Sequence, residues 1–375
     1  MSKSVYVVAG EVSGDIHGAE LMKALRSELG EVTFRGWGGP EMAALEGADL
    51  HDWVDDAAVV GLWEVLKRYS WFKERFDVAL GEIEKFEPDV LLLVDYPGFN
   101  LRLAKQVHLR FPKVKVVQYV APTVWAWHEK RIGQVAVTHD LMLCLFPFEV
   151  PLFEEAGLRS RCAGHPLVDE LEEKRVTVER DAKTVGLFPG SRTKEVTRLF
   201  PLMLKAAKRV LVQDKGVTFA VAAASPKMEV LIREMLVESG LPEGVVAVQL
   251  GESQKLMQTV TCGVVASGTA TLEAAFYGMP YCLVYKLAWG TYLMARQLVK
   301  TPYIGLINIL AGRELIPEYI QAEANPYEVS LWLARYLGGP QLRDDLSEQL
   351  LEAVSRLGEP GVHRRAAHEI SLLFS

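Results

Sequence analysis

Short and almost unbroken apolar runs alternate with segments whose apolar residues recur every three or four positions. The runs occupy residues 5–9, 32–37, 90–95, 114–120 and 141–146, and then 184–188, 218–223, 245–250, 262–266 and 281–285. Strands have such unbroken apolar runs when helices cover both faces of a parallel sheet. The alternation therefore predicts an α/β protein built of doubly wound parallel sheets.

A charged stretch with few large apolar residues, 166–183, separates two halves of similar size. We expect an N-terminal domain over 1–170, a C-terminal domain over 184–325 and a helical tail over 326–375 that closes the second domain or crosses between domains. Two Rossmann-like domains of this kind are expected to face a cleft and to bind ligands at the carboxyl ends of their strands.

Net charge, cysteine spacing and the length of apolar runs exclude some classes of function. The 375 residues carry a net charge of -7, which argues against binding to nucleic acid backbones. The four cysteines lie far apart and three fall in apolar runs, so we expect free thiols rather than disulfides or a metal site. The N-terminus shows no secretory signal and no run approaches the ~18 apolar residues of a membrane span, so we expect a cytoplasmic protein.

The first candidate for chemistry is Asp95, at the carboxyl end of the run 90–95. Pro97 and Gly98 end that strand sharply. A carboxylate held there can take a proton from a substrate hydroxyl, and burial would raise its pKa toward the working range. The alternative is that Asp95 caps the next helix, although Asn100 is better placed for that role.

Two further loops in the first half leave both a functional and a structural interpretation open. The loop 10–18 lacks the dinucleotide glycine spacing, so Ser13 and Asp15 either contact a substrate or cap the helix that follows. In the loop 119–131, Trp125 and Trp127 with the basic Lys130 and Arg131 form either an apolar wall with anion-binding edges or an anchor in the core.

The segment 59–76 is aromatic and basic. Such a helix can lie in a membrane interface, with aromatic residues inward and cations at the headgroups. Soluble surface helices commonly have the same pattern, and the pattern alone favours that alternative.

In the second half, one small-residue turn predicts a nucleotide site. Residues 265–273 pass from a strand through Ser267, Gly268 and Thr269 into a helix that carries Thr271 and Glu273. Small residues let a diphosphate approach free backbone N–H groups, and a carboxylate one turn later can accept hydrogen bonds from ribose hydroxyls. Glu273 could equally form a capping box, and we favour the nucleotide site. The turn ending in Arg192 is either a second anion-binding site, without the P-loop lysine, or a strand-to-helix turn capped by Ser191.

Together these segments resemble the bacterial lipid-A-disaccharide synthase family, in family order over about residues 5–320. The most specific segments are Val-Trp-Ala-Trp at 124–127 and Ala-Gly-Arg-Glu-Leu at 311–315. The resemblance implies a GT-B, inverting, metal-independent glycosyltransferase without a cofactor. It implies condensation of UDP-2,3-diacylglucosamine with 2,3-diacylglucosamine 1-phosphate, giving UDP and a disaccharide 1-phosphate, on the inner face of the cytoplasmic membrane.

The resemblance also assigns residues. The family's general base falls on Asp95, and its UDP contacts fall on Arg192, the turn 267–273 and Asn308. Expected acceptor or loop contacts are Ser13, Asp15, Asn100, Trp125 and Arg131. Because the substrates are lipids, the segment 59–76 becomes the expected membrane or acyl-chain contact, through Leu62, Trp63, Leu66, Tyr69, Trp71 and Phe72.

Two other functions use the same architecture. One is a sugar-nucleotide 2-epimerase with a soluble substrate, and the other is a non-catalytic carrier of lipid or nucleotide. The sequence leaves the oligomeric state open, including a homodimer that exchanges its C-terminal helices.

Overall fold

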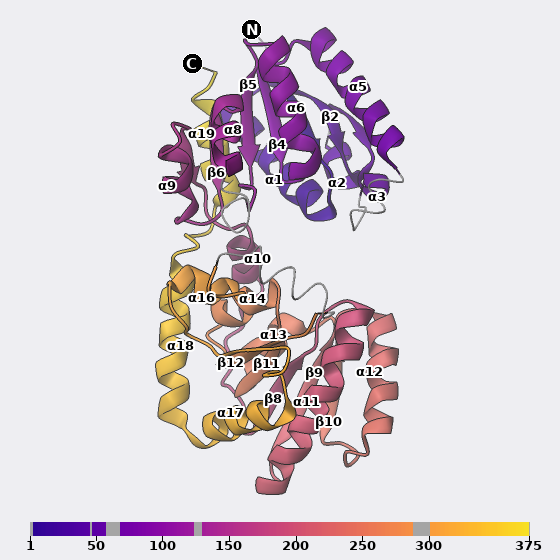
Figure 1. The fold of residues 1–375 in the computed structure, drawn as a ribbon, viewed down its shortest axis with the longest axis vertical. Helices are drawn as coiled ribbons and strands as arrows, with labels where there is room; N and C mark the ends of the chain where they lie inside the picture. The colour runs from indigo at the N-terminus through magenta and orange to yellow at the C-terminus, as the bar shows by residue number, and fades with distance from the viewer. Residues whose placement is uncertain (1–2, 46, 58–67, 124–129, 288–300, 375) are drawn as a thin grey trace. The chain divides into compact units, whose positions relative to one another are not determined.

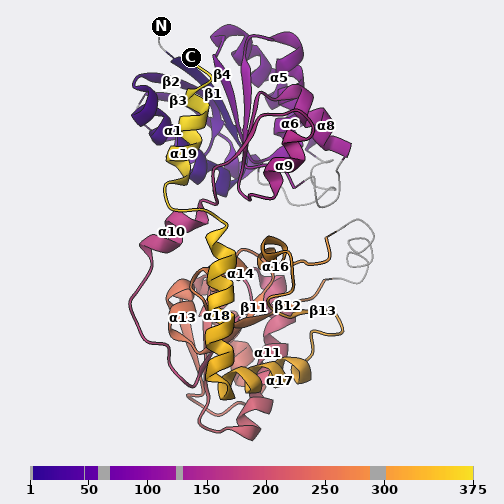
Figure 2. The same cartoon turned by 90° about the vertical axis from the view of Figure 1, so that its left-hand side faces the viewer.

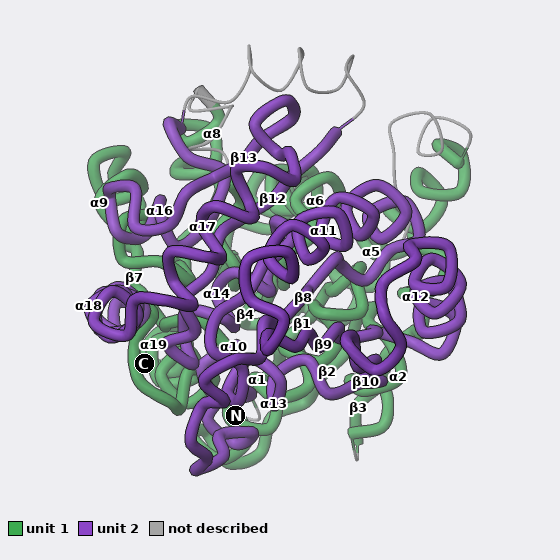
Figure 3. The backbone as a smooth tube through the Cα atoms, turned by 90° about the horizontal axis from the view of Figure 1, so that it is seen from below, with its two compact units in different colours: residues 1–166, 357–375 green, residues 167–356 purple. Residues whose placement is uncertain are grey.

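The computed structural model describes residues 3–45, 47–57, 68–123, 130–287 and 301–374. The chain forms two compact units (Figure 3). Unit 1 comprises residues 1–166 and 357–375, and unit 2 comprises residues 167–356. The tail 326–375 is therefore divided between the units, and the N-terminal segment of unit 1 ends at Pro166.

Unit 1 is built on a seven-stranded sheet in the described residues (Figure 1). Its strand order is β3-β2-β1-β4-β5-β6-β7, and every ladder is parallel. The strands are β1 (Lys3–Ala9), β2 (Val32–Gly38), β3 (Ala48–Asp52), β4 (Val90–Val94), β5 (Lys115–Tyr119), β6 (Leu141–Cys144) and β7 (Ser160–Cys162). The connecting helices are α1 (Val12–Leu29), α2 (Pro40–Ala43), α3 (Val54–Ala57), α5 (Tyr69–Phe86), α6 (Pro97–Arg110), α8 (Lys130–Thr138) and α9 (Glu149–Glu154).

Unit 2 repeats this topology with a six-stranded parallel sheet in the order β10-β9-β8-β11-β12-β13. Its strands are β8 (Thr184–Phe188), β9 (Thr218–Ala223), β10 (Val246–Leu250), β11 (Cys262–Ala266), β12 (Tyr281–Tyr285) and β13 (Glu318–Ile320). Its helices are α10 (Leu167–Glu173), α11 (Thr193–Gln213), α12 (Pro226–Ser239), α13 (Ser253–Thr259), α14 (Ala270–Phe276), α16 (Leu306–Ala311), α17 (Pro326–Gly338) and α18 (Pro340–Ser355).

All ten apolar runs form strands, and the predicted fold class is confirmed. The sequence pattern missed β3, β7 and β13, each of which lies at an edge of its sheet. These strands have three to five residues and carry many exposed or half-buried positions. An edge strand is covered less than a central strand, so it does not need the unbroken apolar run that marks the others.

The last helix, α19 (Val362–Ser371), belongs to unit 1. It lies beside α1 and is drawn in yellow in Figure 2. Val362, Ala366, Ala367 and Ile370 are buried in the same apolar cluster as Leu21 of α1. The C-terminal segment therefore completes one face of the unit 1 core.

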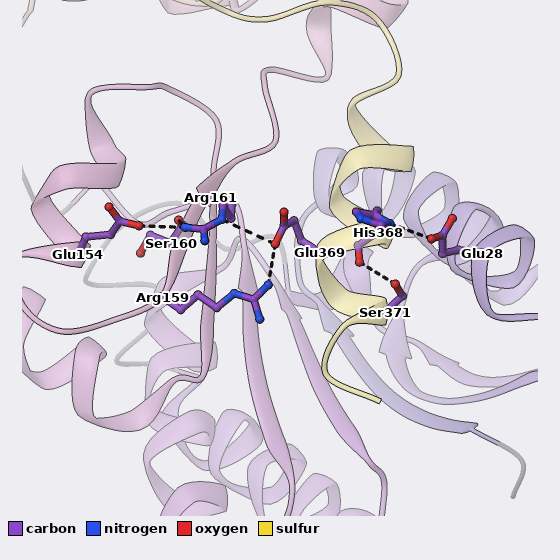
Figure 4. A network of polar contacts seen from close by, with 8 residues as sticks. All are labelled: Glu28, Glu154, Arg159, Ser160, Arg161, His368, Glu369 and Ser371. Atoms are coloured by element: carbon purple, nitrogen blue, oxygen red, sulfur yellow. Dashed lines mark hydrogen bonds and ion pairs between the residues drawn. The ribbon is translucent and has the colours of Figure 1, made fainter. Parts of the chain in front are cut away.

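Polar contacts flank this apolar face of α19 (Figure 4). The Glu369 carboxylate accepts a hydrogen bond from Arg159 at 2.8 Å, and the Arg161 guanidinium lies 3.9 Å away. On the other side, the His368 ring lies 2.9 Å from the Glu28 carboxylate. These pairs are partly exposed to solvent, so we expect them to contribute less to stability than the buried apolar contacts.

No helix in the described residues is long and apolar enough to cross a membrane. The cysteines are free thiols, as predicted: Cys144, Cys262 and Cys282 are buried, and Cys162 is half-buried.

We predict that Ile370→Ala lowers the free energy of unfolding of unit 1 by about 2–5 kcal/mol, because it leaves a cavity in a packed core. His368→Ala, on the exposed face of the same helix, should cost about 1 kcal/mol or less. Urea unfolding followed by hydrogen exchange mass spectrometry reports on unit 1 separately from unit 2. Equal losses for the two variants would show that α19 does not carry this core face.

Candidate functional site

The two sheets share one feature that positions the predicted loops. In unit 1 the strand order reverses between β1 and β4, and Ala9 pairs with Val94 at their ends. In unit 2 it reverses between β8 and β11, where Phe188 pairs with Val265. Ligands of doubly wound sheets bind at the carboxyl ends of the strands at such reversals. The loops that begin at Gly10 and Asp95 are therefore neighbours in unit 1, as are the two corresponding loops in unit 2.

The backbone at Asp95 is unusual. Asp95 and Tyr96 have φ values of 47° and 49°, in the left-handed region that few non-glycine residues adopt. The Asp95 carbonyl oxygen accepts hydrogen bonds from the side-chain amides of Asn100 at 2.8 Å and Gln118 at 3.1 Å. The Asp95 N–H donates to the Tyr119 carbonyl at 2.9 Å. Such a conformation persists only when surrounding contacts hold it, and strain of this kind clusters at functional sites.

Neither Asp95 nor Asn100 occupies the N-cap position of α6. The N-cap is Tyr96, and Pro97 starts the helix. Asn100 is fully buried and its amide nitrogen donates to main-chain carbonyls at the ends of β1 and β4. Asn100 therefore fixes the loop geometry, and the Asp95 carboxylate is not used as a helix cap.

Burial disfavours the ionised form of the Asp95 carboxyl. Burial raises the pKa of the Asp95 carboxyl above its usual range, and a hydrogen bond from the Tyr96 N–H partly opposes this. Burial, and then the negative charge of Asp95, raises the pKa of Glu11. Burial and the charge of Glu11 raise the pKa of Tyr96 to about 12, with Arg68 acting in the opposite direction. A carboxylate with a raised pKa is a stronger base near neutral pH.

The first loop approaches Asp95 closely because it starts with glycine. A Cβ atom on Gly10 would lie 2.3 Å from the Tyr96 ring. Ser13 is exposed on the first turn of α1. The buried Asp15 carboxylate instead accepts three backbone N–H bonds of 2.8–3.0 Å, from Gly39, Glu41 and Met42. Asp15 thus holds the start of α2, and this structural role accounts for its position without a substrate contact.

The predicted membrane or acyl contacts divide into two groups. Leu62, Trp63 and Leu66, like Trp125 in the later loop, lie outside the described residues. Trp71 and Phe72 are half-buried against the core of unit 1. Trp71 also stacks on Trp53, with ring centroids 6.0 Å apart. Tyr69 is 58% exposed. Trp71 and Phe72 thus form part of a packed surface helix, and Tyr69 is available for other contacts.

In unit 2 the turn after β8 presents Arg192. Gly190 has φ of 105°, and a Cβ there would lie 2.5 Å from the Glu195 carboxylate. Glu195 completes a capping box at the start of α11 and lies 3.0 Å from the Arg192 guanidinium. Because 81% of the Arg192 side chain is exposed, the guanidinium can still bind an anion.

The turn after β11 offers backbone donors. Gly268 and Thr269 are exposed, and the N–H groups of Gly268, Thr269 and Ala270 donate to no described residue. Thr271 is buried, and its hydroxyl donates to the Gly268 carbonyl at 2.8 Å. Ser267 is half-buried at the start of the turn. The structure therefore leaves the turn's amides available to a ligand and uses the Thr271 hydroxyl to hold its shape.

Glu273 lies one turn into α14 and is half-buried. Burial, and then the negative charge of Glu170, raises the pKa of Glu273; a hydrogen bond with Gln254 and the charge of Lys174 oppose this. A carboxylate whose surroundings disfavour its charged form is a candidate for binding ligand hydroxyls.

Asn308 has a different environment from the one expected for a nucleotide contact. It is fully buried, and its amide nitrogen donates to the Ile316 carbonyl and to Glu318, both at 2.9 Å. Its amide oxygen accepts from the N–H groups of Leu315 and Ile316. All its hydrogen-bonding capacity is used, so Asn308 ties α16 to the residues before β13.

Two relevant residues escaped the sequence analysis. Gln118 is a polar side chain inside the buried strand β5, and this pattern could have revealed it. Glu11 lies in the loop 10–18, and its interaction with Asp95 needs the β1–β4 pairing to be seen.

Known proteins resemble this chain over nearly its whole length. The family model described as lipid-A-disaccharide synthetase matches residues 5–367. The lipid-A-disaccharide synthase of Syntrophus aciditrophicus is 36% identical over 98% of this chain and 96% of its own length.

Solved structures at low identity show the fold alone. The putative UDP-N-acetylglucosamine 2-epimerase of Listeria monocytogenes has a TM-score of 0.64 at 12% identity, covering all of this chain and 97% of its own. MurG of Acinetobacter baumannii has a TM-score of 0.58 at 12% identity, covering 99% of each chain. The family match and the identity to curated relatives decide the assignment: this chain belongs to the lipid-A-disaccharide synthase family.

Proposed function

We propose that this chain transfers 2,3-diacylglucosamine from its UDP derivative to the 6-hydroxyl of 2,3-diacylglucosamine 1-phosphate. Membership of a glycosyltransferase family of lipid A synthesis supports this reaction. The observation that carries the proposal is Asp95, a half-buried carboxylate with a raised pKa in a strained loop at the strand reversal of unit 1. A carrier would not need such a base, and the family match does not favour an epimerase.

In this proposal Asp95 accepts the proton of the acceptor's 6-hydroxyl as that oxygen bonds to the anomeric carbon of the donor. The bond between this carbon and the UDP oxygen breaks, and its electron pair leaves with the diphosphate. Attack from the face opposite the leaving group inverts the anomeric configuration.

Unit 2 supplies groups suited to the leaving diphosphate. The free amides of residues 268–270 and the exposed Arg192 guanidinium can meet the charge that develops on it. Glu273 is proposed to accept hydrogen bonds from the ribose hydroxyls. Asn308 is proposed to shape this region through its internal hydrogen bonds and not to touch the nucleotide.

We also propose peripheral contact with the inner face of the cytoplasmic membrane, because both substrates carry acyl chains. Among the described residues of 59–76, the exposed Tyr69 beside the basic Arg68 is the best candidate for the interface.

For Asp95→Asn we predict a fall in turnover of about two to four orders of magnitude, the usual scale for loss of a general base. Asparagine tolerates the left-handed backbone, so the loop should keep its shape. The measurement is disaccharide formation by mass spectrometry, with thermal unfolding as the check on folding. Asp77→Asn, an exposed carboxylate of α5, is the control. Near-normal turnover of Asp95→Asn would exclude Asp95 as the base.

The raised pKa of Asp95 also has a consequence for stability. Between the unfolded and the folded pKa values, the native state binds more protons than the unfolded state, so stability falls as pH rises through this window. At pH values above this window, Asp95→Asn should therefore raise the urea concentration at the midpoint of unfolding. The gain should shrink at lower pH and vanish below the ordinary value of 3.8. A gain of the same size at every pH would contradict the raised pKa.

For Glu273→Ala we predict UDP binding about 10- to 100-fold weaker, the scale of a lost charge-assisted hydrogen bond, with little change in acceptor affinity. Isothermal titration with UDP measures the effect. Glu252→Ala removes an exposed carboxylate of the same unit and should leave UDP affinity as it is. Unchanged UDP affinity in Glu273→Ala would remove this residue from the nucleotide site.

A further inference from the structure

A cavity of about 260 Å³ lies in unit 1 between α6 and α8. Matching faces of the two helices line it. Arg102 and Lys105 are three residues apart on α6, and Arg131, Gln134 and Thr138 follow helical spacing on α8. We call this cavity the α6–α8 groove.

Every charged residue in the lining of the α6–α8 groove is basic. Four other cavities in the described part of the chain each include at least one carboxylate. Arg102, Lys105 and Arg131 are exposed, and none of them forms an ion pair with a described residue. In a chain of net charge -7, three unpaired cations around one cavity favour an anionic ligand.

The α6–α8 groove begins next to the proposed base. Pro97 and Gly98 line its end, and they follow Asp95 by two and three residues. α6 begins at Pro97, so the positive end of its helix dipole lies at that end of the groove.

We propose that the α6–α8 groove binds the phosphate monoester of the sugar acceptor, with Arg102, Lys105 and Arg131 as its cationic contacts. This inference rests on the proposed function. Guanidinium groups can bind a phosphate through two parallel hydrogen bonds, and a lysine ammonium adds a point charge. In the acceptor, the 1-phosphate and the 6-hydroxyl are attached on either side of the ring oxygen. Binding the phosphate here would direct the hydroxyl toward Asp95.

Phosphates of an anionic bilayer have similar chemistry, so the experiment must separate the two sources. The test variant is Arg102→Ala with Lys105→Ala. The matched control is Arg110→Ala with Lys113→Ala, which removes one arginine and one lysine that are exposed at and beyond the other end of α6. Thermal unfolding confirms that both double variants remain folded.

The first measurement is binding of glucosamine 1-phosphate, which needs no turnover. We expect binding at least tenfold weaker in the test variant and unchanged in the control. Equal binding by the wild type and the test variant would overturn the proposal. Because this readout is independent of catalysis, it still tests the groove if the wild-type protein forms no disaccharide, a result that would overturn the proposed function alone.

The second measurement is steady-state kinetics in neutral detergent micelles. For diacylglucosamine 1-phosphate we expect the acceptor KM to rise about tenfold in the test variant, with kcat within twofold of the wild type. With diacylglucosamine lacking the phosphate, the test variant and the wild type should behave alike. An equal loss with both acceptors would overturn the proposal. So would a loss that occurs only on vesicles containing phosphatidylglycerol, because it would assign the cations to the bilayer.

Discussion

Parallel pairing at the strand reversals, β1 with β4 and β8 with β11, is the constraint on which the site depends. It brings together loops that are about 85 residues apart in the sequence of unit 1 and about 75 apart in unit 2. Gly10 allows the Tyr96 ring to lie against the first loop, and Asn100 bonds to the ends of both strands. The catalytic geometry proposed here therefore follows from strand order.

The Asp95 loop combines several features that oppose folding. It has two consecutive residues in the left-handed region, a half-buried carboxyl with a raised pKa and a second carboxyl nearby at Glu11. The buried amide oxygens of Asn100 and Gln118 have no hydrogen-bond partner among the described residues. Proteins keep such arrangements where function requires them and stabilise them through the surrounding core. Here that core is formed by β1, β4 and β5, whose apolar residues are buried.

The sequence pattern predicts the elements that repeat along the chain, such as the central strands. It misses features that depend on contacts between residues far apart in the sequence. Central strands were predictable because burial on both faces demands an apolar run, whereas the edge strands β3, β7 and β13 lack that demand. The position of Asp95 at the end of a strand was predictable because it follows an apolar run directly. The roles of Asp15 and Asn308 were not, because a motif does not show which way a polar side chain turns. Both residues direct their side chains inward, to main-chain groups of other segments.

The two units use one topology with opposite chemistry. At the reversal of unit 1 the side chains are acidic, and Glu11 and Asp95 would repel a diphosphate. At the reversal of unit 2 the turn offers free amides beside an exposed arginine, and its carboxylate lies a turn into the helix. The proposed base must gain a proton and the proposed diphosphate site must stabilise a leaving anion, and a single pair of loops could not meet both electrostatic demands well. Because the protein has two units of the same topology, each unit's pair of loops can meet one of these demands.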